Sequence, residues 1–242
     1  SCLLIFWIQP KGKFKSERIK NMKENGKKSL IIGSVFTIAF IVWTILIQTV
    51  DVQPVGQNRT DVGFATWNLW FHKLTGANML LYTITDWLGL VPLFVCLIFA
   101  GMGFCQLLQR KNLFKVDADI IILGVYYVIV IGCYLLFEAI PVNYRPILMN
   151  GVMEASYPSS TTLLVVTVMP TLVEQALRRM KKNTLSKVIA VGFIAFSLFM
   201  VVGRLVSGVH WITDIIGSML FSLGLFLIYK GLVQVFLCKE MR

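Results

Sequence analysis

Long apolar runs separated by short polar segments dominate the pattern of residues along this chain. A helix needs roughly 20 predominantly apolar residues to cross the ~30 Å hydrocarbon layer of a bilayer, where its backbone must satisfy its own hydrogen bonds. The fourth and fifth runs are shorter, and Pro170 and Glu174 interrupt the fourth near its end. The pattern predicts an all-α integral membrane protein built as a six-helix transmembrane bundle. We expect the spans at 30–50, 88–108, 120–137, 161–173, 188–202 and 215–229.

An additional helical pattern lies between the first two predicted spans. Phe64, Trp67, Phe71 and Leu74 recur at the spacing of one helix face. A short aromatic helix of this kind is typical of the bilayer interface. Two roles fit it, an aromatic belt that anchors the bundle and a gate for substrate, and the frequency of such belts favours the anchor.

Composition and charge agree with a membrane protein, because 57% of the residues are hydrophobic and only 14% are charged. When alternate loops are assigned to the two faces of the membrane, 19 of the 23 Lys and Arg residues fall on one side. Basic loops stay in the cytoplasm, so we expect both termini there. This bias also accounts for the net charge of +11, and we therefore expect the bilayer, not a nucleic acid, as partner.

The chain divides into three predicted parts. Residues 1–28 form a basic cytoplasmic segment, 29–237 the membrane domain with its core at about 88–229, and 238–242 a cytoplasmic tail. Met22 begins a more ordinary start before the first span, so residues 1–21 are interpreted as a tail or as sequence upstream of the natural start.

Polar groups gather in the loops on the side that carries few basic residues. Pro158-Ser159-Ser160 begins the fourth span, and the free N–H groups of a helix start favour phosphate there. Arginine forks on neighbouring loops can grip the same anion. His210 and Asp214 are four residues apart, so on a helix the carboxylate can hold one imidazole nitrogen protonated and leave the other as nucleophile or base.

These residues resemble the three signature motifs of the type 2 phosphatidic acid phosphatase superfamily, in order and in spacing. That family has Lys-x6-Arg-Pro, then Pro-Ser-Gly-His, then Ser-Arg-x5-His-x3-Asp. The matching residues here are Arg145-Pro146, Pro158-Ser159, and Arg204 with His210 and Asp214. The resemblance implies a six-helix membrane protein with all three motifs at one side.

The resemblance also implies roles for these side chains. His210 would attack phosphorus and form a phosphohistidine, and Asp214 would orient its ring. No metal ion and no other cofactor is implied. The residues that would bind the phosphoryl oxygens are Arg145, Arg204, Ser159 and Ser160.

Three of the positions that depart from the family pattern carry polar or catalytic side chains in the family. Glu138 stands where the first motif has lysine, Thr161 where the second has histidine, and Gly203 where the third has serine. The missing histidine is the family's general acid, which protonates the departing oxygen. A threonine hydroxyl cannot donate a proton near neutral pH, and general acid help contributes typically about 10² to 10⁴ in rate.

Three hypotheses fit these departures. The substrate is a lipid diphosphate, whose leaving group is itself a phosphate that leaves without protonation. Alternatively, Glu138 is held protonated at the membrane edge and replaces the acid at Thr161. In the third, the protein binds or transports a lipid phosphate without hydrolysing it.

We expect a phosphatase that acts on a lipid phosphate, preferably an isoprenoid diphosphate such as undecaprenyl diphosphate. The site would face away from the cytoplasm in a bacterial plasma membrane and would serve recycling of carrier lipid for the cell envelope. Phosphatidic-acid-type lipids are the other substrate class, and a homodimer stays open. This preference rests on the family resemblance, because a fold does not fix a function.

Overall fold

The computed structural model describes residues 11–180 and 184–240, and within these ranges the regular structure is helical. Short 3-10 turns at Gln57–Arg59 and Leu113–Lys115 lie in two of the connections. The α-helices are α1 (Lys11–Thr49), α2 (Ala65–Thr75), α3 (Met79–Leu88), α4 (Leu90–Arg110), α5 (Ala118–Ala139), α6 (Ser160–Arg179), α7 (Thr184–Val206) and α8 (Ile212–Glu240).

Six helical segments in the described part of the chain are long and apolar enough to cross a membrane, which confirms the predicted integral membrane bundle. The second span differs from the prediction because it comprises α3 and α4 and runs over Met79–Arg110. It begins earlier because the Asn78 side chain accepts a hydrogen bond from the Leu81 N–H at 3.0 Å and caps α3. The predicted start of this span at residue 88 was therefore wrong, because the span also includes the polar residues of α3.

Helix α6 occupies the centre of the bundle and is longer than its apolar run. It continues through Pro170 to Arg179, so the expected interruption does not end it. A larger share of its membrane-spanning residues is buried inside the bundle than in any of the other five spans. Packing on several sides, together with an ion pair between Arg178 and Glu174 at 2.9 Å, offsets the backbone bond that Pro170 removes.

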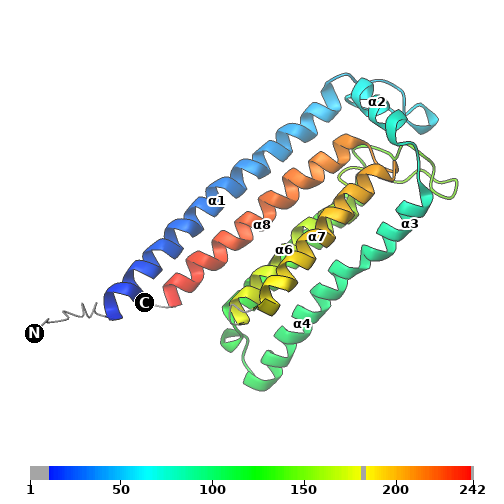
Figure 1. Ribbon diagram of the computed structural model, residues 1–242. Coiled ribbons are helices and arrows are strands. Elements are labelled where there is room, and N and C mark those ends of the chain that lie inside the picture. The colour runs from blue at the N-terminus through cyan, green and yellow to red at the C-terminus, as the bar shows by residue number, and fades with distance from the viewer. Residues whose placement is uncertain (1–10, 181–183, 241–242) are drawn as a thin grey trace, which may run out of the picture.

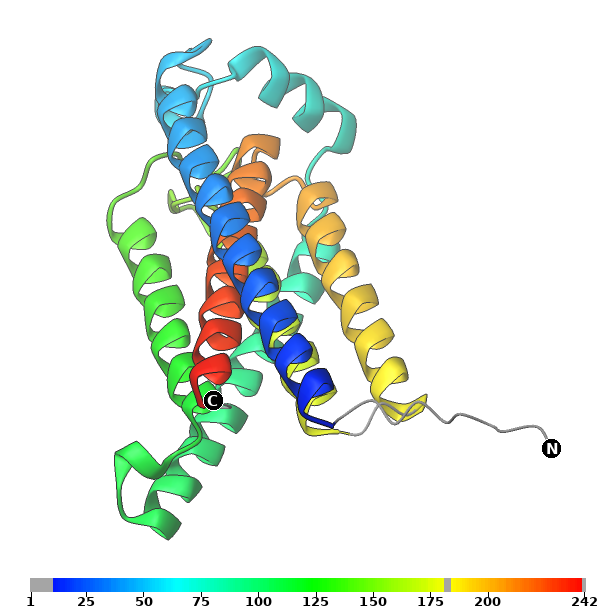
Figure 2. The same ribbon diagram turned by 90° about the vertical axis from the view of Figure 1, so that its left-hand side faces the viewer.

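Helices α1 and α8 run side by side along the bundle (Figure 1 and, from the side, Figure 2). Their close approach depends on small residues: a Cβ at Gly33 would come 2.9 Å from the Gly224 carbonyl oxygen. The opposite face of α1 carries exposed apolar side chains, Ile31 and Ile38 among them, as a lipid-facing helix should.

The bundle has two distinct ends, opposite each other in Figure 1. The motif end holds α2 and the connections α5–α6 and α7–α8, and the termini end holds the start of α1 and the end of α8. The predicted boundaries at 28 and 237 fall inside α1 and α8 and stay predictions. Residues 1–10 and 241–242, which belong to the predicted terminal segments, lie outside the described residues.

The predicted interfacial helix is confirmed as α2, which lies across the motif end (Figure 1). Trp70 and Leu74 on it are exposed, while Asn68 is completely buried. The Asn68 amide donates to the Thr213 hydroxyl at 3.0 Å and to the Gly63 carbonyl at 2.8 Å. Helix α2 is therefore fixed to the start of α8, next to the predicted site.

Candidate active site

His210 lies in the short connection between α7 and α8 and is almost completely buried. Its Nδ1 is 3.1 Å from the Ser156 carbonyl oxygen. A carbonyl only accepts, so this contact fixes the tautomer that carries its proton on Nδ1. Nε2 is buried and has no hydrogen-bond partner among the described residues. The ring thus presents an unprotonated nitrogen, the form that a nucleophile requires.

Burial and nearby positive charges keep this imidazole neutral. Burial lowers the pKa of His210 well below its usual value, and the nearby positive charges of Arg145 and Arg204 lower it further. The hydrogen bond to Ser156 acts in the opposite direction and is a smaller influence on the pKa. A neutral ring and two cations therefore lie near one another in a buried region.

Asp214 contacts the histidine less directly than the sequence pattern predicts. Helix α8 begins at Ile212, so His210 precedes the helix and does not share a face of it with Asp214. One carboxylate oxygen accepts from the Trp211 N–H at 2.9 Å and lies 3.8 Å from His210 Nδ1. Asp214 thus holds the turn that carries the histidine, while the Ser156 carbonyl fixes its ring.

Arg145 reaches the site from a small hairpin between α5 and α6. Its N–H donates to the Glu154 carbonyl at 3.1 Å, and Ser156 N–H donates to the Asn143 carbonyl at 2.9 Å. At the tip, Asn150 and Gly151 have positive φ, which suits a tight two-residue turn. The Arg145 side chain is buried, and its Nε lies 3.2 Å from a Glu154 carboxylate oxygen. The two groups form an ion pair, but their geometry does not make a hydrogen bond.

Arg204 approaches from the last turn of α7 and is 1% exposed. Its Nη1 lies 3.5 Å from both the Thr85 hydroxyl and the Asp86 carboxylate of α3. The Tyr82 ring lies 4.9 Å from the guanidinium carbon of Arg204 and 5.8 Å from that of Arg145. The Tyr82 ring therefore lies close to both arginines and stabilises two neighbouring positive charges.

Ser159 occupies the N-cap position of α6, directly beside α8. Its carbonyl accepts from the Ser218 hydroxyl at 3.0 Å, and its own hydroxyl donates to Thr162 at 3.1 Å. The first N–H groups of α6 have no acceptor within the helix, as at any helix start. The structure thus brings the predicted cradle of Ser159 against the Asp214 helix, with a weak 3.5 Å contact between the Ser159 N–H and the Asp214 carbonyl.

The side chains of Ser160, Thr161 and Glu138 are not drawn into this cluster. Ser160 and Glu138 line a separate pocket of only about 10 Å³, and Glu138 is exposed. Among the described residues Glu138 forms no ion pair with either arginine, so its predicted role as substitute acid has no supporting contact. Thr161 is buried with its methyl group toward Gly89, at the junction of α3 and α4.

Four further residues complete the site and were missed from the sequence: Tyr82, Asp86, Glu154 and Ser156. Tyr82 and Asp86 are four residues apart, a spacing that places both on one face of a helix. That signal was present in the sequence. Glu154 and Ser156 act through a loop contact and a backbone carbonyl, which spacing alone does not indicate.

The cluster is suited to a tetrahedral anion. Three buried arginine donors of the cluster, Arg145 Nε and Nη1 and Arg204 Nε, lack hydrogen-bond partners in the described chain, and so does the unprotonated His210 Nε2. Buried donors without acceptors are costly in a folded protein unless a ligand satisfies them. The described residues contain no group of three His, Cys, Asp or Glu side chains placed to hold a metal ion.

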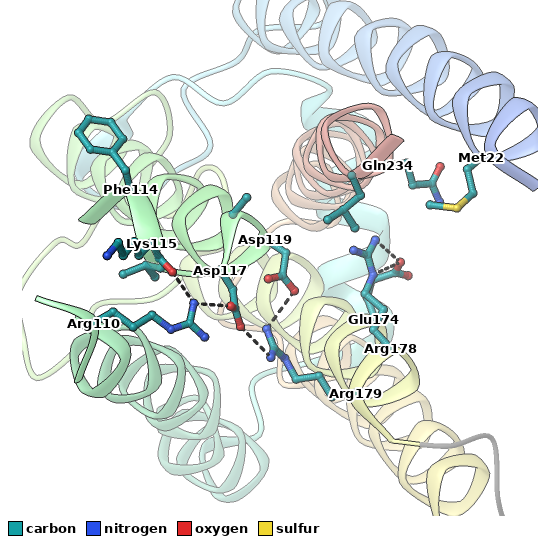
Figure 3. Close-up of a pocket in the computed structure, with 13 residues that line it drawn as sticks. Met22, Arg110, Phe114, Lys115, Asp117, Asp119, Glu174, Arg178, Arg179 and Gln234 are labelled. Atoms are coloured by element: carbon teal, nitrogen blue, oxygen red, sulfur yellow. Dashed lines mark hydrogen bonds and ion pairs between the residues drawn. The ribbon is translucent and has the colours of Figure 1, made fainter. Parts of the chain in front are cut away.

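A second polar cluster lies at the termini end, around a pocket of about 640 Å³ between α4, α5, α6 and α8 (Figure 3). Here the charges are paired: Arg110 with Asp117 at 2.8 Å, and Arg179 with Asp119 at 3.0 Å. Arg179 also lies 3.5 Å from Asp117, so the two pairs form one network. This arrangement ties the ends of three helices together.

The comparisons with known proteins agree with the motif geometry. The family model of the PAP2 superfamily matches residues 29–236. The fold is similar to the crystal structure of a transmembrane PAP2-type phosphatidylglycerolphosphate phosphatase from Bacillus subtilis. The two chains are 16% identical, with a TM-score of 0.56 over 83% of this chain and 95% of that one. The search of curated proteins gave no match.

The family match covers all six spans and every motif residue of the site, apart from the first turns of α1 and the last of α8. The membrane bundle and the structural neighbour point the same way. This chain belongs to the PAP2 superfamily.

Proposed function

We propose that this protein is a membrane lipid phosphatase that removes phosphate from a lipid (di)phosphate through a phosphohistidine on His210. The observation that carries the proposal is the buried Nε2 of His210, which has no hydrogen-bond partner among the described residues and lies near two arginines with three such nitrogens, Arg145 Nε and Nη1 and Arg204 Nε. A transition state that places negative charge on phosphoryl oxygens would satisfy the arginine donors in this buried site.

The chemistry follows from these groups. The Nε2 lone pair of His210 attacks phosphorus, and the bond to the departing oxygen breaks with its electron pair on that oxygen. The two arginine forks hold the phosphoryl oxygens, and the Ser156 carbonyl accepts from the Nδ1–H of the charged ring. Water then attacks the phosphohistidine, which releases phosphate and restores the neutral ring.

An isoprenoid diphosphate is the preferred substrate in this proposal. Its leaving group is a phosphate, which departs as an anion and tolerates threonine at the position where the family has its acid histidine. Grooves on the lipid-facing side of the bundle suit a long hydrocarbon tail, since one of about 430 Å³ between α6, α7 and α8 is lined almost entirely by apolar side chains.

The test is phosphate release from undecaprenyl diphosphate, undecaprenyl phosphate and phosphatidic acid by purified protein. We expect release by the native chain, a loss of about 10⁴-fold or more in His210→Ala, and acid-labile label on the protein during turnover. Lipid-phosphate binding without any release, retained in His210→Ala and lost in Arg204→Ala, would establish a binding or transport protein instead.

The proposed side of the membrane is tested separately. The positive bias of the loops supports a motif end that faces away from the cytoplasm, in a bacterial plasma membrane. Val152 lies at the hairpin tip and is exposed, so Val152→Cys is a suitable reporter. An impermeant thiol reagent should label it in intact cells, with Leu113→Cys at the termini end as the matched position that stays unlabelled. The opposite pattern would reverse the orientation.

A further inference from the structure

Helix α3 brings a carboxylate to the phosphate-binding arginine. Asp86 Oδ1 lies 3.5 Å from Arg204 Nη1, and the side chain of Asp86 is 53% exposed, so a second molecule can reach it. Tyr82, one turn earlier on the same helix, contacts the same guanidinium. Asp86 is therefore at the edge of the site and next to a group that would hold the phosphoryl oxygens.

The same turn of α3 adjoins Thr161, the position where the family has its acid histidine. A Cβ at Gly89 would come 2.9 Å from the Asp86 carbonyl oxygen and 3.2 Å from the Thr161 Cγ2 methyl. The helix that carries Asp86 thus packs directly against Thr161, which lacks the proton-donating ring of the family's histidine. Because threonine is smaller than histidine, the end of α3 can pack closely beside residue 161.

The third departure from the family pattern brings α3 close to α7. A Cβ at Gly203 would come 2.7 Å from the Thr85 Cγ2 methyl, a distance that real Cβ contacts do not reach without a shift. Thr85 immediately precedes Asp86, and Gly203 immediately precedes Arg204. Glycine at 203 therefore allows the contact between Arg204 and Asp86.

Two other carboxylates near the arginines are less suited to act on a substrate. Glu154 lies on the hairpin beside the Nε of Arg145. Glu138 lines the separate small pocket with Ser160. Of these three carboxylates, Asp86 alone combines exposure, contact with Arg204 and a place on the helix end that packs against Thr161.

We propose that Asp86 is the general acid of this phosphatase, in place of the histidine that Thr161 replaces. The inference rests on the proposed function and extends its substrate class to alkyl phosphate monoesters, whose leaving alkoxide needs a proton. As His210 Nε2 attacks phosphorus, the P–O bond breaks toward the leaving oxygen, and the Asp86 carboxyl proton passes to that oxygen. Asp86, now a carboxylate, then takes a proton from the water that attacks the phosphohistidine.

Substrate binding changes the contacts of Asp86. In the free protein the carboxylate contacts Arg204. A phosphate that binds Arg204 competes for that guanidinium and places negative charge beside Asp86. The phosphate and Asp86 then share Arg204, which keeps the carboxyl group beside the leaving oxygen.

The decisive experiment compares leaving groups in Asp86→Asn. Alkyl phosphates such as dodecyl phosphate should lose about 10² to 10⁴ in kcat/KM, because their alkoxide needs the acid. p-Nitrophenyl phosphate, whose leaving group departs unprotonated, should change by no more than about threefold. Asp61→Asn is the control, since Asp61 is an exposed acid at the motif end and forms no ion pair among the described residues.

Two further variants separate catalysis from structure. Thr161→His in the Asp86→Asn background should restore alkyl phosphate cleavage at least about tenfold, which the loss of a purely structural aspartate would not permit. Gly203→Ala should reduce alkyl phosphate cleavage but spare p-nitrophenyl phosphate, because its Cβ displaces α3 at Thr85. Gly192→Ala on the same helix has open space around it and should change neither activity.

Each alternative result is informative. If Asp86→Asn lowers both rates equally, leaves both unchanged, or only lowers KM, Asp86 is a counterion of Arg204 and the inference is wrong. If the native chain hydrolyses diphosphates but no alkyl monoester, the inference fails while the proposed function stands. If no substrate releases phosphate, both fail.

Discussion

The two ends of the bundle treat charge in opposite ways. At the motif end, Arg145 and Arg204 are buried, and some of their nitrogens have no hydrogen-bond partner in the described chain. At the termini end, Arg110 and Arg179 are partly exposed and each is paired with an aspartate at 3.0 Å or less (Figure 3). Both clusters tie helix ends together, but the motif end keeps three arginine nitrogens without partners, Arg145 Nε and Nη1 and Arg204 Nε, whereas the termini end keeps one, Arg178 Nη1.

This difference separates a site for a ligand from a structural network. A buried donor without an acceptor costs roughly 1–3 kcal/mol of folding free energy, so it persists where a ligand completes it. An exposed ion pair costs little and contributes little. The motif end is therefore organised for an anion, and the termini end for the alignment of α4, α5 and α6.

The same substitution at both ends gives the largest expected contrast. Arg204→Lys should reduce kcat/KM by about 10² to 10³, because lysine cannot present a planar fork to phosphoryl oxygens. Arg179→Lys should leave kcat/KM within about twofold, because its partners, Asp117 and Asp119, accept a point charge as well. Phosphate release by the two variants measures this.

Thermal unfolding provides the control for this contrast. If Arg204→Lys strongly lowers the Tm as well as the activity, the loss of activity reflects a loss of structure. If both arginine variants lose activity equally, the two ends do not differ in the way described.

Ligand binding should stabilise the protein through the motif end alone. Orthovanadate, an analogue of the phosphoryl transition state, should raise the Tm, because an anion at 100 times its Kd contributes about 2.7 kcal/mol. Arg145→Gln should remove this increase, since its Nη1 is a free donor in the site. Arg178→Gln at the termini end should retain it. A rise in Tm that depends on Arg178 would place the anion site at the wrong end.

Much of the fold and the centre of the site could be predicted from the sequence. Apolar runs determine the spans, because a bilayer imposes one length and one backbone solution on each of them. The spacing of Arg204, His210 and Asp214 fixes three groups around one turn, so local geometry brings them together. Arg145 was identified by its motif and is brought to the others by the hairpin at 143–156.

What the sequence could not provide are contacts between helices far apart along the chain. Asp86 meets Arg204 only because α3 packs against α7 at Gly203, a fact of tertiary packing. Glu138 was one candidate for a substitute acid from its place in the first motif, but it lies near the end of α5 and lines a small pocket with Ser160. The role of the Ser156 carbonyl depends on the hairpin, and a backbone atom carries no residue-type signal.

The pH dependence of activity should report the electrostatics of the motif end. Burial and the two arginines lower the pKa of His210, so the neutral nucleophile should persist below pH 6.5 and the acid limb of kcat/KM should fall below that value. The free energy of unfolding also falls as the pH is lowered. The unfolded chain binds this proton more readily, so stability is complete above about pH 6.5 and declines as the pH falls toward the lowered value.

His72, the other histidine of the chain, is the matched control for this profile. Burial lowers its pKa too, and its ring packs at 5.7 Å against Trp211, next to His210 in sequence. His72→Gln should leave the acid limb of kcat/KM in place. An acid limb that starts above pH 6.5 in the native chain, or one that moves in His72→Gln, would contradict the assignment to His210.

The smallest effect is expected at the termini end. Asp117 accepts a hydrogen bond from Arg110, which is the main reason that its pKa lies below the usual value. Its contribution to stability is therefore present above about pH 4 and lost as the pH falls through the lowered pKa. Because both side chains are about one-third exposed or more, Asp117→Asn should cost less than about 1 kcal/mol and lower the Tm by no more than about 4 °C. Phosphatase activity should stay within about twofold, and a larger loss would mean that the paired charges of the termini end also act on the site at the opposite end.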